Sequence, residues 1–146
     1  MHVIGSLDLV QSLLALWLLD RFDLRVWVGR PAPEQLLDER PGESSAAVRE
    51  RVSAAREVAT QRGHGPNSTL SAAMLDEVAP LSPSALELVR TELDRGRMSG
   101  RGLHRVRRVA RTIADLRGGP NVVDAEHIVL ALQMRVDLAA LSGMRS

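Results

Sequence analysis

Cysteine and lysine are absent from this chain of 146 residues, and aromatic side chains are few. Without cysteine, the chain can form no disulfide, no thiolate metal site and no cysteine nucleophile, and its composition is compatible with a reducing cytosol. The aromatic residues are Trp17, Phe22 and Trp27. The core must therefore be built from leucine, valine and alanine, which favours helices over sheets.

The absence of lysine excludes one common nucleotide site. All 19 basic residues are arginine. A phosphate-binding P-loop uses a lysine ammonium that follows a glycine-rich turn, whose backbone N–H groups cradle the phosphates. The sequence contains neither the lysine nor a turn of the form Gly-x-x-x-x-Gly. We therefore expect that the chain alone binds no nucleotide cofactor by this device and hydrolyses no ATP.

A membrane-spanning run is also missing from the sequence. The apolar run from Leu7 to Leu19 is too short to cross a bilayer and is interrupted by Asp8, Gln11 and Ser12. No lysine or arginine precedes this run, and no small-residue cleavage site follows it. We expect a cytoplasmic location and no membrane partner.

The histidines and serines do not suggest catalysis. The four histidines show no metal-ligand spacing with one another, so we expect no metal site and no histidine-based triad: His2, His64, His104 and His127. The chain contains no lysine that could act as the base for a serine nucleophile at Ser44 or Ser45. We interpret this pair as a helix cap.

Capping and turn signals predict a mainly α fold. Ser82-Pro83 is a strong helix start, and Gly118-Gly119-Pro120 ends another helix. Leu24–Val28 alternates and predicts one short strand, whose partner strands we expect in another chain or in a part that is missing. The predicted helices cover residues 7–19, 33–38, 44–62, 71–78, 83–95, 99–116 and 124–135.

Three segments carry most of the information. In the first, Arg21 lies between Asp20 and Asp23 just before the strand, which is typical of a surface ion pair. The second runs from Gly42 to Val52 and is a capped helix start with exposed charge pairs.

The third segment is the arginine-rich helix from Ser99 to Leu116. Its core-facing stripe is Leu103, Val106, Val109, Ala110, Ile113 and Leu116. Arg101, Arg105 and Arg108 line another face of the helix near its N-terminus, where free N–H groups and the helix dipole favour a polyphosphate. A solvated arginine-rich face fits the same pattern, and the sequence chemistry leaves both readings open.

In this order, the segments resemble the C-terminal part of the magnesium-chelatase-like AAA+ proteins, the competence protein ComM family in particular. The resemblance spans about residues 18–138. It rests on four stretches of this sequence: 19–23, 42–56, 101–116 and 124–135.

The resemblance implies roles for particular arginines. Arg21 matches an arginine finger that acts in trans on a neighbouring subunit's γ-phosphate. Arg101 matches the sensor-2 arginine of the lid, and we assign Arg105 to nucleotide contact with it. The family implies ATP and Mg²⁺ as cofactors of the full-length protein. It also implies a homo-oligomeric, hexameric ring or the remainder of the AAA+ core as partner, and a role in moving DNA branch points during natural transformation.

The resemblance also implies a domain organisation. Residues 1–30 hold an unmatched N-terminal segment and the last strand of a truncated AAA+ core, residues 31–43 a linker, residues 44–138 a helical lid and residues 139–146 a tail. The P-loop, Walker B and sensor-1 elements of the family are missing from the sequence. We therefore expect either an expressed fragment or a truncated gene product, and a degraded, non-functional product is a further alternative.

A different class of function stays open. The stretch 95–117 holds eight arginines, and residues 101–146 carry eight arginines against four acids. A free-standing helical module that binds nucleic acid through this stretch is the alternative hypothesis. The near-neutral total charge, the few aromatic residues and the lack of a helix-turn-helix pattern count against it.

Overall fold

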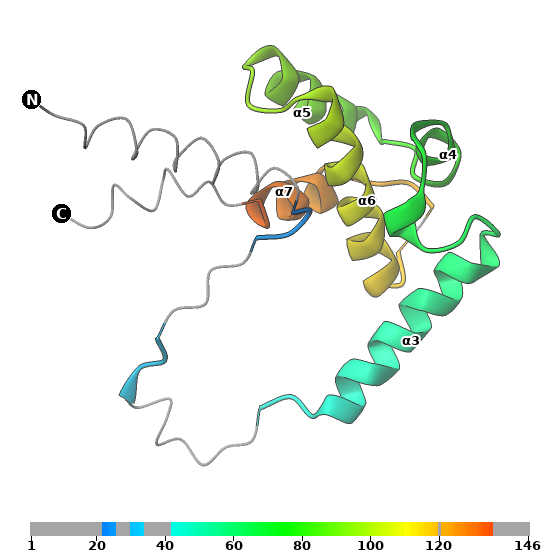
Figure 1. Ribbon diagram of the computed structural model, residues 1–146, viewed down its shortest axis with the longest axis vertical. Coiled ribbons are helices and arrows are strands. Elements are labelled where there is room, and N and C mark those ends of the chain that lie inside the picture. Colours follow the sequence, from blue (N-terminus) through cyan, green and yellow to red (C-terminus); the bar gives the residue numbers. More distant parts are fainter. Residues whose placement is uncertain (1–21, 26–29, 34–41, 120, 136–146) are drawn as a thin grey trace, which may run out of the picture.

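The computed structural model describes residues 22–25, 30–33, 42–119 and 121–135 (Figure 1). This part is mainly helical, as predicted. Its elements are α3 (Ser45–Gln61), the short 3₁₀ helix η1 (Asn67–Thr69), α4 (Ala72–Val78), α5 (Pro83–Asp94), α6 (Gly100–Leu116) and α7 (Ala125–Gln133). The predicted helix 7–19, most of the predicted helix 33–38 and the tail 139–146 lie outside the described residues.

Serine hydroxyls start four of these helices, at the positions that the sequence indicated. Each hydroxyl accepts a hydrogen bond from the backbone N–H three residues later, at 3.1 to 3.3 Å. The capping residues are Ser44, Ser71, Ser82 and Ser99. At α7, the Asp124 N–H donates instead to Nδ1 of His127 at 3.0 Å. These local bonds satisfy backbone donors that would otherwise be unpaired, which fixes where the helices begin.

Helix α6 is the centre of the domain. It packs against α7, α3, η1 and α4, while α5 packs against α7. Val106 and Ala110 of α6 are fully buried beside Leu75 and Ile128 of the neighbouring helices. Leu116, which we predicted in the core stripe, is 37% exposed instead.

Helix α3 leaves this core at an angle. Figure 1 shows its C-terminal end near α6 and its N-terminal end away from the other labelled helices. Its buried residues are Ala55 and Ala59, both in the C-terminal half. Val48 continues the same apolar stripe but is 37% exposed. The N-terminal half of α3 therefore has an apolar face that the described part of the domain does not cover.

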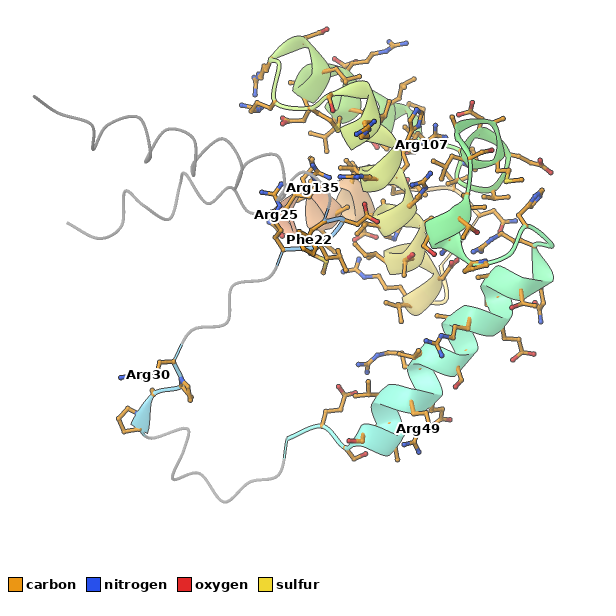
Figure 2. The ribbon with its side chains drawn as sticks, in the orientation of Figure 1. Phe22, Arg25, Arg30, Arg49, Arg107 and Arg135 are labelled. Atoms are coloured by element: carbon orange, nitrogen blue, oxygen red, sulfur yellow. The ribbon has the colours of Figure 1, made fainter. Side chains whose placement is uncertain are left out.

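The predicted strand has a partner inside the chain. The Arg25 N–H donates to the Met134 carbonyl at 2.6 Å, and Arg25 forms an isolated parallel bridge with Arg135. Figure 2 shows the two arginines together at the end of α7. The expectation that segment 24–28 lacks any in-chain partner is therefore wrong at Arg25, because the chain that leaves α7 offers its own free backbone groups. Residues 26–28 lie outside the described part.

No helix in the described ranges has the length and apolarity that a membrane crossing requires.

Candidate functional site: the arginines of helix α6

Arg101 lies in the first turn of α6 and is exposed. The Ser99 hydroxyl caps this turn by accepting from the Gly102 N–H at 3.1 Å. No described residue pairs with the Arg101 guanidinium. Its charge adds to the positive end of the helix dipole, so the site suits an anion with several oxygens.

Arg105, one turn further along α6, is held differently. Its Nε lies 3.2 Å from Oδ1 of Asp23, and its side chain is only 15% exposed. The ion pair joins the segment before the predicted strand to the helix. The structure therefore does not present Arg105 beside Arg101 as a second open cation.

Arg108 is also engaged. Its Nε donates to the Leu70 carbonyl at 2.8 Å, which joins α6 to the residue after η1. The sequence placed Arg101, Arg105 and Arg108 on one face, and of these three only Arg101 has no partner among the described residues.

Arg107 is buried and supports α4. Its Nη1 donates to Oδ1 of Asp76 at 2.7 Å, and its Nη2 donates to the carbonyls of Leu75 and Ala79 at 2.8 and 3.1 Å. The Ala79 carbonyl follows the last residue of α4, where backbone acceptors lack helical partners, whereas the Leu75 carbonyl also accepts from the Ala79 N–H at 3.0 Å. Figure 2 shows Arg107 beside α6 on the side of α4.

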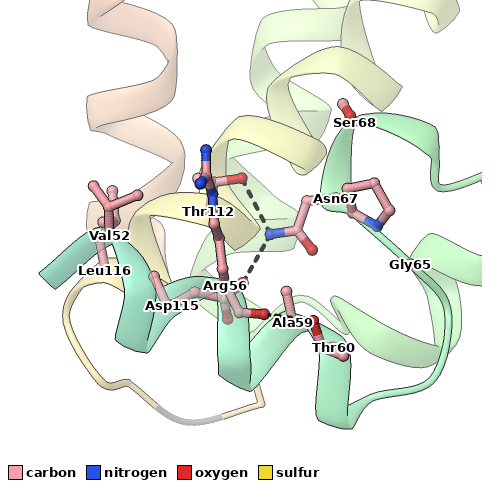
Figure 3. Close-up of a pocket in the computed structure, with 12 residues that line it drawn as sticks. Val52, Arg56, Ala59, Thr60, Gly65, Asn67, Ser68, Thr112, Asp115 and Leu116 are labelled. Atoms are coloured by element: carbon pink, nitrogen blue, oxygen red, sulfur yellow. Dashed lines mark hydrogen bonds between the residues drawn. The ribbon is translucent and has the colours of Figure 1, made fainter. Parts of the chain in front are cut away.

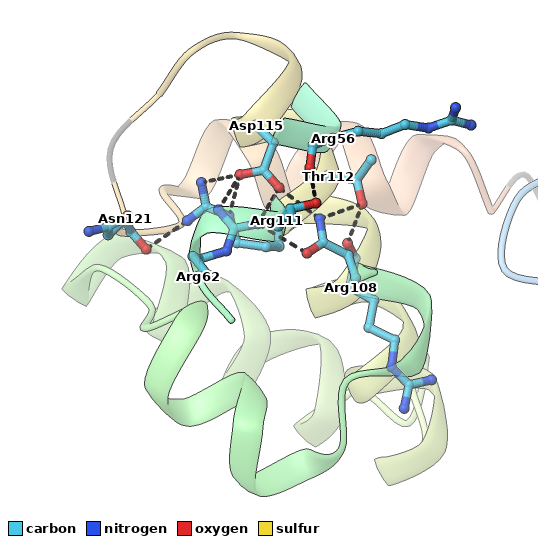
Figure 4. A network of polar contacts seen from close by, with 9 residues as sticks. Arg56, Arg62, Arg108, Arg111, Thr112, Asp115 and Asn121 are labelled. Carbon is cyan, nitrogen blue, oxygen red and sulfur yellow. Dashed lines mark hydrogen bonds and ion pairs between the residues drawn. The ribbon is translucent and has the colours of Figure 1, made fainter. Parts of the chain in front are cut away.

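A buried polar network occupies the C-terminal half of α6 (Figure 4). Arg111 is fully buried, and its Nη2 lies 2.9 Å from Oδ1 of Asp115. Its Nη1 donates to the Asn121 carbonyl at 2.7 Å. Arg62, at the end of α3, reaches both oxygens of the same carboxylate, and Asn67 donates to it at 2.7 Å. Two guanidiniums thus share one buried carboxylate.

This environment shifts the ionisation of the network. Burial alone would raise the pKa of Asp115, but hydrogen bonds from Arg62 and Asn67 and the charge of Arg111 outweigh burial and hold that pKa below its ordinary value. Burial lowers the pKa of Arg111, against the opposing effect of Asp115. Arginine stays protonated at neutral pH, so the network carries one negative and two positive charges.

These positions match a known protein family. The family described as "Magnesium chelatase, subunit ChlI C-terminal" matches residues 42–135, which hold α3 to α7 and the whole buried network.

The chain belongs to this family.

Relatives of the ChlI C-terminal domain extend the likeness. The chain is 43% identical over 105 residues to the uncharacterized protein Rv2897c of Mycobacterium tuberculosis, which covers 69% of this chain and 21% of that protein. It is 37% identical over 119 residues to YifB of Escherichia coli, and this alignment covers 80% of this chain and 23% of YifB. It is 33% identical over 127 residues to the competence protein ComM of Haemophilus influenzae, and this alignment covers 86% of this chain and 25% of ComM. The chain therefore spans about a fifth to a quarter of these relatives.

Within the ChlI C-terminal domain, the motif from Arg101 to Leu116 divides into two parts. Its first turn presents Arg101 at the surface, and its later part builds the core and the network around Asp115. Sequence reasoning missed Arg62 and Asn67, because their partners are distant in the chain. The available signal was two helix positions, Arg111 and Asp115, spaced as an ion pair on a face next to the apolar stripe.

The domain also has a groove between α3 and α6, with a volume of about 550 Å³. Figure 3 shows Val52, Ala59 and Leu116 around it, with Asn67 and Asp115 at its inner side. In the described ranges, histidines and acids form no cluster of three that could hold a metal ion. Arg21, the predicted arginine finger, lies outside those ranges.

Proposed function

We propose that this chain is the lid region of an ATP-driven ring, in which Arg101 contacts the bound nucleotide. The observation that carries this proposal is that Arg101 is exposed, has no partner among the described residues and lies on a helix anchored in the core. Its free donors and the positive end of α6 fit a phosphate group. The rigid helix would transmit any change at the phosphate to the rest of the lid.

ATP and Mg²⁺ would be held mainly by other parts of the full-length protein, because this chain has no lysine for a P-loop. When bound, they supply the phosphoryl group and neutralise the charge that develops on it. Arg101 would add a guanidinium on the lid side. Arg21 would act in trans, as an arginine finger of the neighbouring subunit in a hexameric, cytoplasmic ring.

A role in DNA processing is the further part of the proposal. One of the relatives is named a competence protein. We propose that the ring, by analogy, moves DNA branch points in natural transformation. The ring would then contact DNA through parts that lie outside the lid.

The alternative, a free-standing nucleic-acid module, has less support. Six of the eight arginines in 95–117 are engaged in the described part of the chain, with acids or backbone carbonyls: Arg97, Arg105, Arg107, Arg108, Arg111 and Arg117. Arg95 interacts electrostatically with Glu92, and Arg101 has no described partner. A phosphate-binding surface needs several free cations on one face, which this helix does not offer.

The experiment is a chimera in which residues 18–135 of this chain replace the matching segment of ComM. We expect Arg101→Ala to weaken ATP binding about tenfold, the loss of a charge-assisted hydrogen bond. Arg90→Ala is the matched control, because Arg90 is exposed and has no partner among the described residues, and it should leave the affinity unchanged. Calorimetry on the active parent chimera and both variants measures this. Equal affinities in all three would refute the role of Arg101.

A further inference from the structure

The groove between α3 and α6 has apolar walls. They are formed by Val52, Ala55 and Ala59 of α3, together with Pro66 and Leu116. From Val52 to Thr60, the α3 wall is roughly 12 Å long, which is about two helical turns. Val48 extends the apolar stripe by one more turn, and both Val48 and Leu116 are 37% exposed. The groove is therefore long enough for successive side chains of one docked helix.

The polar groups at the inner side of the groove are already paired. Asp115 Oδ1 accepts from Arg62 and Arg111, and Oδ2 accepts from Arg62 and Asn67. The Asn67 amide also donates to the Thr112 hydroxyl, which donates to the Arg108 carbonyl. A polar ligand would find no unpaired donor or acceptor in this cluster. The groove thus offers contact to apolar side chains rather than a site for small polar ligands or for catalysis.

The rim of the groove is positively charged. Arg56 lines it, and Figure 4 shows its side chain pointing away from the network. Arg49 lies two turns earlier on α3, where Figure 2 shows it at the surface. Both side chains are exposed and have no partner among the described residues. Behind the wall, Arg62 and Arg111 share the single charge of Asp115.

We propose that this groove is a docking site for an acidic amphipathic helix of a partner protein. Two or three apolar residues, spaced three or four apart, would fill the space between Val52 and Leu116. Aspartate or glutamate beside them would pair with Arg49 and Arg56. Helix-in-groove recognition of this kind takes affinity from the apolar anchors and selectivity from the charged rim.

The probe is a fluorescein-labelled helical peptide of about 15 residues, built of glutamate and alanine with three leucines at this spacing. A matched peptide carries lysine in place of every glutamate. Fluorescence anisotropy with the full chain measures both affinities, and backbone amide NMR shifts locate the contact. We expect the acidic peptide to bind at least about tenfold more tightly than the basic one, with shifts at Val52, Ser68 and Leu116.

Two variants test the rim and the walls separately. Arg56→Glu should weaken binding of the acidic peptide about tenfold and strengthen binding of the basic peptide, because it reverses one charge at the rim of the groove. Ser68→Trp should abolish binding of both, because the indole would occupy the groove that Ser68 lines. The matched controls are Arg90→Glu on α5 and Ala54→Trp on α3, which are exposed positions outside the groove. They should leave both affinities unchanged.

Three results would each overturn the proposal. The first is no shift at the groove residues with either peptide. The second is equal affinity for the acidic and basic peptides, which would remove the role of the rim. The third is self-association of the chain that rises with concentration in sedimentation experiments and that Ser68→Trp abolishes. This result would mean that a second copy of the chain occupies the groove.

Discussion

Arg62 and Asp115, which lie 53 residues apart in the chain, form a two-pronged ion pair with Nη1–Oδ1 at 2.7 Å and Nη2–Oδ2 at 2.5 Å. The pair joins the C-terminal end of α3 to the C-terminal half of α6. The Asp115 side chain is 1% exposed and that of Arg62 is 13% exposed, so water screens the pair little. Together with Ala55 and Ala59, it fixes the angle at which α3 leaves the domain.

Removing the charge of Asp115 should therefore destabilise the domain strongly. Asp115→Asn would remove the carboxylate charge that the buried Arg111 and the largely buried Arg62 share. We expect a loss of about 3–5 kcal/mol in the free energy of unfolding, measured by urea denaturation followed by circular dichroism. Arg117→Gln is the matched control, because the pair Arg117–Glu126 is exposed and should contribute less than about 1 kcal/mol. Similar losses in the two variants would contradict this account.

The same carboxylate predicts a dependence of stability on pH. The pKa of Asp115 is lower in the folded domain than in the unfolded chain, where it is about 3.9. The network therefore stabilises the fold fully above the unfolded value, and this contribution is lost as the pH falls through the folded value. As the pH is lowered from about 5 to about 2, the urea midpoint of the wild type should decrease more steeply than that of Asp115→Asn. Parallel pH curves would show that another group is responsible.

Local signals in the sequence predicted most of the fold. Serines at the starts of three helices, Ser44, Ser82 and Ser99, predicted where these helices begin, because each cap bonds only within its own first turn. The apolar spacing of α6 placed Val106, Ala110 and Ile113 in the core correctly. The prediction that Leu116 lies in the core was wrong, because Leu116 lines the open groove, where α3 does not cover it.

The roles of the arginines could not be predicted in the same way. An arginine side chain is long, and its partner is chosen by the packing of distant segments rather than by spacing along the helix. Arg105 pairs with Asp23 and Arg108 with the Leu70 carbonyl, so two of the three arginines on the predicted phosphate face are engaged. The contact of Arg25 with Met134 also joins distant segments, but through backbone groups rather than through the arginine side chain.

Arg107 should stabilise α4 locally. Its guanidinium satisfies the Leu75 and Ala79 carbonyls and pairs with Asp76. In Arg107→Gln the Ala79 carbonyl and Asp76 lose this partner, and the Leu75 carbonyl keeps only the Ala79 N–H. Amide exchange should therefore become faster in α4 while α5 keeps its protection. Arg95→Gln is the control and should change neither helix, because the side chain of Arg95 is exposed and its described interaction, with Glu92, is only electrostatic. Unchanged exchange in α4 would mean that packing alone holds this short helix.

The isolated chain should neither bind ATP tightly nor hydrolyse it. It has no lysine and no glycine-rich turn of the P-loop type, and Arg101 alone offers one cation to a triphosphate. Calorimetry with ATP and Mg²⁺ should give no affinity in the micromolar range. A micromolar dissociation constant for the purified chain would show that it has a nucleotide site of another kind.

The last prediction concerns Arg21, which precedes the described residues, and it needs a complete motor. In the chimera with ComM, Arg21→Ala should leave nucleotide affinity nearly intact and reduce turnover, because a finger acts on charge that develops in the transition state. The expected loss is on the order of 10³–10⁵ in rate. Arg21→Lys should rescue poorly, because an ammonium lacks the planar fork of the guanidinium.

Mixing subunits decides whether Arg21 acts across a subunit boundary. An Arg21→Ala subunit keeps its own phosphate site, and a subunit with a disabled P-loop keeps its own finger. Each is inactive alone, but a mixed ring places an intact finger beside an intact phosphate site at some of its boundaries. Partial recovery of ATP hydrolysis in mixed rings, with assembly verified by sedimentation, is therefore expected. If assembled mixed rings stay inactive, Arg21 does not act across the boundary, and the trans-acting part of the proposed function is wrong.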